Sequence, residues 1–263
     1  MSKHEWYWGI ASYKRVNRQP MLEMLVGMGY PKDRIILSTQ TEEDYKDYSE
    51  KWGDMATIIY RPGSNISDNK NTILDYIVEN CENARLVMCS DKVRGINRMG
   101  KDKNLYPIDT RTKMDDLVKK AFFVADSLKG NIWGTYSVGN TFYMSHTIHI
   151  NQSILGCFMG ILKPSSVRFD VNLPLKEDLG LFLNTVEKKG RVIRYNDVCL
   201  TATLHTTGGC HEAWNSEGDI VNTGCCAYLL SRYPKLVKPH ATRKNEVRYV
   251  GPTCKINKSI FEI

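Results

Sequence analysis

Residues 86–93, LVMCSDKV, form a short apolar stretch that leads directly into an isolated acid, Asp91. A buried apolar run of this length, bounded by polar residues, is typical of a central strand in an α/β sheet. Ligands of such sheets collect at the carboxyl ends of the strands. We therefore expect Asp91 to lie at a ligand site, although an Asp that only opens a turn would give the same pattern.

The sequence around this stretch alternates between strand and helix patterns. Strands are predicted at residues 6–11, 34–38 and 57–60, with helices at 20–29, 41–51 and 68–80. Right-handed crossovers between such elements give a mostly parallel central sheet flanked by helices. Later patterns predict helices at 115–128 and 174–189 and strands at 131–137, 192–195 and 199–204, and leave the apolar run 153–162 unassigned.

We predict one α/β domain over residues 1–209 and a basic C-terminal extension, 210–263, packed on it. The first strand is not followed by GxGxxG, and no GxxxxGK[ST] occurs, so a dinucleotide-binding enzyme and a P-loop NTPase are disfavoured. No apolar stretch is long enough to span a bilayer, and residues 1–5 lack the apolar core of a signal peptide. We expect a cytoplasmic protein without a membrane partner.

Positive charge is concentrated in two segments of the chain. The net charge is +7, with seven basic residues against two acids between Lys92 and Lys113, and eight against one between Arg232 and Lys258. Solvated loops would explain such clusters, but their interleaved tyrosines favour a polyanion surface. The candidate nucleic-acid contacts are Lys101, Lys103, Arg243, Lys244 and Arg248.

Polar residues also follow the first and third predicted strands. Tyr13 is suited to stacking on a base, and Lys14 or Arg15 to meeting a diphosphate with charge-assisted hydrogen bonds. The helix that begins near Asp68 would offer backbone N–H groups to a phosphate, although Asp68 is equally suited to capping that helix.

This order of elements resembles a GT-A glycosyltransferase and, within that fold, the bacteriophage DNA-base glycosyltransferases of the TET/JBP-associated type. The resemblance covers roughly residues 6–209 and implies a UDP-sugar as co-substrate. By this resemblance the donor-binding residues are Ser12, Tyr13, Lys14, Arg15, Arg61, Asn65, Asn69, Lys70, Ser90 and Lys92.

The resemblance also implies a divalent metal, Mn²⁺ or Mg²⁺, with Asp91 and His205 as its ligands. Such enzymes usually place two acids after the fourth strand, whereas this chain continues from Asp91 with Lys92 and Val93. Two outcomes follow: a metal held by Asp91, water and another ligand, or a metal-poor site in which Lys92 supplies the positive charge. A zinc site near Cys210 and His211 is ranked below reduced structural thiols.

Glu177 and Asp178 stand in the first turn of a predicted helix, where acids also favour the helix dipole. An inverting glycosyltransferase needs a carboxylate to take the proton from the acceptor hydroxyl. By resemblance Asp178 is the expected base, with Glu177 second; a retaining enzyme would need no such base.

The predicted function is transfer of a sugar, glucose from UDP-glucose being favoured, onto a 5-hydroxymethylpyrimidine in double-stranded phage DNA. By resemblance, this modification would protect the DNA from host restriction. One alternative keeps the fold and changes the acceptor to a glycan or a protein, which is favoured if the basic clusters are scattered. Another is a catalytically inactive module that binds nucleotides or nucleic acid, favoured by the single acid at the metal motif.

Overall fold

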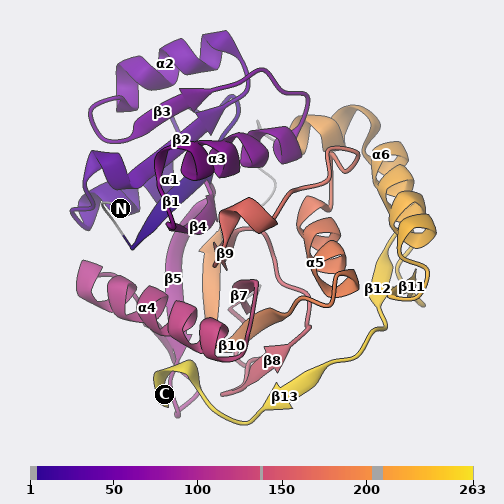
Figure 1. The fold of residues 1–263 in the computed structure, drawn as a ribbon. Coiled ribbons are helices and arrows are strands. Elements are labelled where there is room, and N and C mark those ends of the chain that lie inside the picture. The colour runs from indigo at the N-terminus through magenta and orange to yellow at the C-terminus, as the bar shows by residue number, and fades with distance from the viewer. Residues whose placement is uncertain (1–4, 137–138, 203–209, 263) are drawn as a thin grey trace.

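The computed structural model describes residues 5–136, 139–202 and 210–262, with side chains from residue 220 onward in the last range. Its centre is a sheet of eleven strands. Nine of them follow the order β13-β8-β10-β7-β9-β4-β1-β2-β3, and the other two are β5, which pairs with β10, and β6, which pairs with β5. Helices pack on both faces of this sheet (Figure 1). The predicted α/β class, with a central sheet flanked by helices, is confirmed.

The amino-terminal half of the sheet is parallel because a helix returns the chain to the same end after each strand. The strands are β1 (Trp6–Ala11), β2 (Ile35–Thr39), β3 (Thr57–Tyr60) and β4 (Arg85–Ser90), and β1 lies between β2 and β4. The helices are α1 (Pro20–Gly27), α2 (Glu42–Trp52) and α3 (Ile66–Asn80), and a 3-10 turn, η1 (Lys32–Arg34), precedes β2. The predicted positions of these elements are confirmed to within a few residues.

The second half of the chain adds antiparallel pairs to the sheet. β9 joins the two halves, since it pairs antiparallel with both β4 and β7, while β7 pairs parallel with β10. The elements are β5 (Val93–Met99), β6 (Leu105–Pro107), α4 (Arg111–Ser127), β7 (Ile132–Tyr136), β8 (Ile148–Ile150), β9 (Phe158–Ile161), η2 (Pro164–Ser166), α5 (Glu177–Glu187), β10 (Val192–Ala202) and α6 (Cys210–Arg232).

The C-terminal segment contributes to the central sheet as well as to a small one. Its remaining elements are β11 (Val237–Pro239), β12 (Val247–Tyr249), β13 (Cys254–Ile256) and η3 (Ile260–Glu262). β13 pairs with β8, whereas β11 and β12 form a separate two-stranded sheet. The domain boundary at residue 209 stays a prediction. No helix in the described ranges has the length and hydrophobicity needed to cross a membrane.

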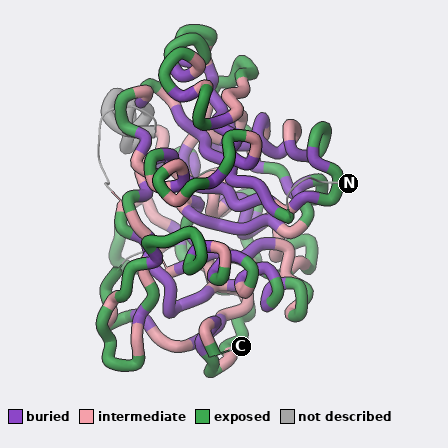
Figure 2. The backbone as a smooth tube through the Cα atoms, turned by 90° about the vertical axis from the view of Figure 1, so that its left-hand side faces the viewer, coloured by how far each residue is buried: buried purple, intermediate pink, exposed green. Residues whose placement is uncertain are grey.

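The hydrophobic core has two parts, one on each face of the sheet. In β1, Trp8 and Ile10 face the layer of α1, α2 and α4, whereas Tyr7 and Ala11 face the layer of α3, α5 and α6. Both faces of a strand are buried in this way only when helices cover both sides. In Figure 2 the buried segments accordingly run through the middle of the molecule, with exposed segments at its periphery.

One strand prediction is wrong, and three helices begin a few residues from their predicted starts. Residues 192–195 and 199–204 were expected as separate strands, but β10 is continuous from Val192 to Ala202 with a register shift between Tyr195 and Cys199. The polar residues between them are buried and bonded: Asn196 donates to Thr147, and Asp197 accepts from Ser259.

The helix expected from residue 174 begins instead at Glu177, after Lys176 adopts a left-handed φ of 60°. The helix expected from residue 68 begins at Ile66, because Asn65 and not Asp68 caps it by accepting from the N–H groups of Ser67 and Asp68. The helix expected from residue 115 begins at Arg111, where the Thr110 hydroxyl accepts from the N–H of Lys113.

Gly160 makes the junction between the two halves of the sheet possible. It lies opposite Trp133 in the β7–β9 pair, and a Cβ atom on Gly160 would overlap the Trp133 indole ring. That ring is fully buried and contacts Phe122 and Phe158 edge-on at centroid distances of 5.4 and 5.6 Å. Because residue 160 is a glycine, the Trp133 ring can pack directly against β9 in the core.

We predict that Gly160→Ala lowers the free energy of unfolding by about 2–3 kcal/mol, because the core has no room for the added methyl group. Urea unfolding followed by tryptophan fluorescence measures the change. The matched control is Gly95→Ala in β5, where the nearest atom to a new Cβ, Thr201 Cβ, lies 3.9 Å away. Equal unfolding midpoints for the two variants would contradict this description of the junction.

Candidate functional site

A cavity of about 170 Å³ lies at the carboxyl ends of β1 and β4. Its walls come from five parts of the chain: the end of β1 and the segment after it, the end of β4 and the segment after it, the first turns of α3, the segment before β9, and the start of α5. Because these parts are distant in sequence, only the folded chain brings them together. The lining residues are Ala11, Tyr13, Ile66, Lys70, Cys89, Ser90, Asp91, Lys92, Gly156, Cys157, Glu177 and Asp178.

Asp91 is buried at the wall of this cavity, with 5% of its surface exposed. Ser12 Oγ donates to Asp91 Oδ2 at 2.9 Å, and Arg15 Nη1 lies 3.8 Å from Asp91 Oδ1. Burial raises the pKa of Asp91, while Arg15 and Ser12 act in the opposite direction. The expected placement of Asp91 beside a cavity at the end of β4 is therefore observed, and its carboxyl group also anchors the segment after β1.

The same cavity is lined by a cluster of one cation and two acids, Lys70, Glu177 and Asp178. Lys70 Nζ lies 2.7 Å from Glu177 Oε1, with side-chain exposures of 6% and 14%. Burial lowers the pKa of Lys70, but Glu177 and Asp178 outweigh this effect and the pKa is raised on balance. The cluster therefore keeps a charged ammonium group inside the protein.

Asp178 differs from Glu177 in its partners. Asp178 Oδ2 accepts from the Gly156 N–H at 2.9 Å, and Oδ1 accepts from the N–H of Leu179 at 2.7 Å. Burial and the neighbouring Glu177 raise the pKa of Asp178, and Lys70 and the backbone donors oppose the rise. A carboxylate with a raised pKa that, among the described residues, accepts hydrogen bonds only from backbone N–H groups is suited to accepting a proton.

Gly156 and Cys157 are site residues that the sequence analysis did not single out. A Cβ on Gly156 would lie 2.9 Å from Asp178 Cβ and 3.0 Å from Lys70 Nζ, so only glycine lets this segment approach the cluster. The Cys157 carbonyl accepts from the N–H of Ser90 at 2.8 Å, which ties the segment to the end of β4. The glycine inside the apolar run 153–162 was the available signal.

The described residues supply few metal ligands. No group of three His, Cys, Asp or Glu side chains within them lies close enough together to hold a metal ion, and His205 lies outside the described residues. Asp91 is the acid at the end of β4, and Ser12 and Arg15 already contact its oxygens. Asp91 therefore fits a divalent ion only together with oxygens from a bound substrate or from elsewhere in the chain.

The structure brings part of the predicted donor site to the cavity. Tyr13, Lys70, Ser90 and Lys92 line it. Ser12 and Arg15 contact the carboxyl group of Asp91. Three other predicted donor residues stabilise the backbone around the cavity instead of lining it. Asn69 donates to the Ser12 carbonyl at 3.0 Å, Asn65 caps α3, and Lys14 has a left-handed φ of 52° with its backbone N–H donating to Asp44.

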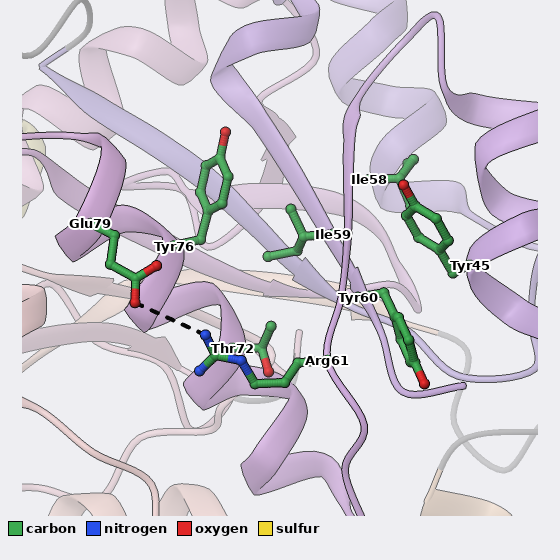
Figure 3. A pocket seen from close by; sticks show the side chains of 8 residues that line it. All are labelled: Tyr45, Ile58, Ile59, Tyr60, Arg61, Thr72, Tyr76 and Glu79. Atoms are coloured by element: carbon green, nitrogen blue, oxygen red, sulfur yellow. Dashed lines mark ion pairs between the residues drawn. The ribbon is translucent and has the colours of Figure 1, made fainter. Parts of the chain in front are cut away.

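Arg61 is not brought to this cavity. It lines a separate hollow of about 430 Å³ between α2, β3 and α3, whose walls include Tyr45, Tyr60 and Tyr76 (Figure 3). Its guanidinium lies 2.7 Å from Asp75 and 4.0 Å from Glu79. These acids satisfy its charge, so the placement does not favour a contact between Arg61 and a donor in the cavity.

The five candidate nucleic-acid contacts do not lie together. Lys101 and Lys103 lie in the turn between β5 and β6, where Lys101 pairs with Glu262 near the C-terminus at 3.5 Å. Arg243 and Lys244 precede β12, and Arg248 lies within it. Figure 1 places the C-terminus and β12 on opposite sides of the molecule.

Comparisons with known proteins identify the fold. No family model matches the chain, and no curated protein matches its sequence. Glucosyl-3-phosphoglycerate synthase from Mycobacterium tuberculosis, in complex with phosphoglyceric acid, is 10% identical with a TM-score of 0.51 over 89% of this chain and 81% of that one. The same enzyme with Mn²⁺, UDP and glucosyl-3-phosphoglycerate is 10% identical with a TM-score of 0.50 over 93% and 87% of the two chains. The predicted GT-A-like fold is confirmed.

We predict that Lys70→Met lowers the free energy of unfolding by about 3–5 kcal/mol near neutral pH, because it leaves buried carboxylates without a counter-charge. The loss should shrink as the pH falls from neutral, since protonation of Asp178, whose pKa is already raised, removes the repulsion. Urea unfolding of the variant and the wild type at neutral and at acidic pH measures this loss of stability.

The control is Lys46→Met, which removes an i,i+4 pair with Glu42 whose side chains are 72% and 69% exposed. Exposed pairs contribute little, so this variant should unfold as the wild type does at both pH values. A Lys70→Met variant with wild-type stability, or with a loss that does not depend on pH, would contradict the described cluster.

Proposed function

We propose that this chain is a glycosyltransferase that moves a sugar from a UDP-sugar to a hydroxyl group of an acceptor. The observation that carries the proposal is the cavity at the carboxyl ends of β1 and β4, whose lining combines Lys70, Glu177 and Asp178 with Tyr13 and Asp91. The fold supports it, because one of the similar solved structures is a glucosyl-3-phosphoglycerate synthase in complex with UDP and its glucosylated compound.

In this proposal the donor lies along the ends of β1 and β4. Tyr13 offers its ring to the uracil base, and Lys92 offers its ammonium group to the diphosphate. When Mn²⁺ or Mg²⁺ is bound with the donor, Asp91 is the carboxylate that would hold it, and the ion would neutralise phosphate charge. The chain's own cations, Lys92 and Arg15, supply positive charge at the same place.

The reaction forms one bond and breaks one. The acceptor hydroxyl oxygen bonds to the anomeric carbon, the bond from that carbon to the diphosphate breaks, and UDP leaves with the electron pair. The hydroxyl proton moves to Asp178 Oδ. We assign this role to Asp178 rather than Glu177 because Glu177 is committed to Lys70, whereas Asp178 accepts only backbone N–H groups in the described part of the chain.

For the acceptor we keep the proposal of a 5-hydroxymethylpyrimidine in DNA, with glucose as the sugar. The net charge of +7 supports a polyanionic partner. A base inside a duplex would have to leave the stack to reach the anomeric carbon. The separation of the candidate nucleic-acid contacts instead favours a glycan or a protein as the acceptor.

We predict that Asp178→Asn lowers kcat for sugar transfer by about 10²–10⁴-fold, because the variant has no base to take the hydroxyl proton. The Kd for UDP, measured by calorimetry, should stay at the wild-type value, since Asp178 acts on the acceptor side. The matched control is Asp116→Asn on α4, an acid that is 53% exposed and pairs with Lys120.

Two outcomes would contradict the proposal. If wild-type protein binds UDP but releases none from any UDP-sugar, the chain is the inactive nucleotide-binding module. If Asp178→Asn transfers sugar at the wild-type rate, the base is misassigned or the transfer retains configuration.

The acceptor is tested with radiolabelled UDP-glucose and three acceptors in parallel: hydroxymethylated duplex DNA, the same duplex with unmodified pyrimidines, and a mixture of glycans. We expect label only in the hydroxymethylated duplex, because only that DNA carries the attacking hydroxyl. Label in the glycans alone would replace the DNA acceptor by the alternative while leaving the donor chemistry intact.

A further inference from the structure

A second hollow, of about 750 Å³, adjoins the cavity on the side of α1 and β5. Arg15, Arg18, Lys92 and Arg94 line it, and we call it the basic hollow. Glu23 is the acid in its wall. The basic residues come from the segment between β1 and α1 and from the β4–β5 connection, so the fold gathers them from separate parts of the chain.

The charges of the basic hollow are not balanced from within the protein. Arg15 is buried against Asp91, but Arg18, Lys92 and Arg94 form no ion pair with an acid in the described part of the chain. Other basic residues of the fold, such as Arg61 and Lys176, do have acidic partners. With Glu23 as the acid in this wall, positive charge is still in excess, and a bound anion would reduce the repulsion among the three cations.

The basic hollow is adjacent to the candidate active site. Lys92 lines both the hollow and the cavity, and the Arg15–Asp91 pair lies between them. An anion in the hollow would therefore lie beside the donor and not at a remote surface. Phosphate oxygens suit this place, since arginine binds them through paired, charge-assisted hydrogen bonds.

We propose that the basic hollow binds a phosphate group of the acceptor and so positions the acceptor hydroxyl at the cavity. This inference rests on the proposed glycosyltransferase function and narrows its acceptor to a phosphate-bearing molecule. Two sources share that chemistry: the backbone of a DNA strand and a small phosphorylated hydroxy compound. Arg18 and Arg94 are then substrate-positioning residues, and neither was assigned a role from the sequence.

The test uses Arg18→Gln, Arg94→Gln and the double variant, with two phosphate-bearing probes. Calorimetry measures the Kd of 3-phosphoglycerate, and fluorescence anisotropy measures the Kd of a short unmodified DNA duplex at fixed salt. We expect each single substitution to raise the Kd of one of these two probes about tenfold, because each removes a charge-assisted contact to phosphate. The Kd for UDP should not change. The probe that loses affinity identifies the source of the phosphate.

Lys119→Gln is the matched control, since Lys119 is exposed on α4, lies outside both basic clusters, and pairs with no described acid. Wild-type affinity of the double variant for both probes would overturn the inference. A weakened Kd for UDP would overturn it too, because the hollow would then hold the donor. These readouts need no turnover, so failure of UDP binding by the wild type would count separately, against the proposed function.

Discussion

The buried ion pair between Lys70 and Glu177 is the constraint on which the site depends. It joins α3, which belongs to the parallel half of the sheet, to α5, which follows the antiparallel strand β9. With 5% of Lys70 exposed, its charge is tolerable only beside a partner. The two helices therefore meet where the ammonium group reaches the carboxylate, at the carboxyl end of β4.

The same constraint creates the chemistry of the cavity. Glu177 is paired with Lys70, whereas burial and the neighbouring Glu177 raise the pKa of Asp178. Gly156 lets the segment before β9 approach within hydrogen-bonding distance of Asp178 and closes the site. Functional sites commonly hold such groups at a cost in stability. The rigid sheet junction at Trp133 and Gly160 provides the support for them.

Local patterns explain what the sequence could predict. The stretch before Asp91 and the periodic helices after β1, β2 and β3 carry their signal within a few residues, so their positions were predicted. The Lys70–Glu177 pair spans 107 positions, and no local pattern indicates it. Arg61 follows a strand as Tyr13 does, yet the fold directs it to Asp75. Asn196 and Asp197 led to the wrong prediction that the strand ends at residue 195. Their hydrogen-bond partners, Thr147 and Ser259, are distant in sequence, so no local pattern shows that these two polar residues are buried within β10.

We propose that the cavity between β1, β4 and α5 is a nucleotide-sugar site, and a crystal structure of the wild-type protein with UDP is the decisive test. We expect the uracil ring against Tyr13 and the diphosphate within hydrogen-bonding distance of Lys92, with Asp178 left open to an acceptor. UDP bound in the hollow beside Arg61, or a cavity that stays empty at saturating UDP, would rule this site out.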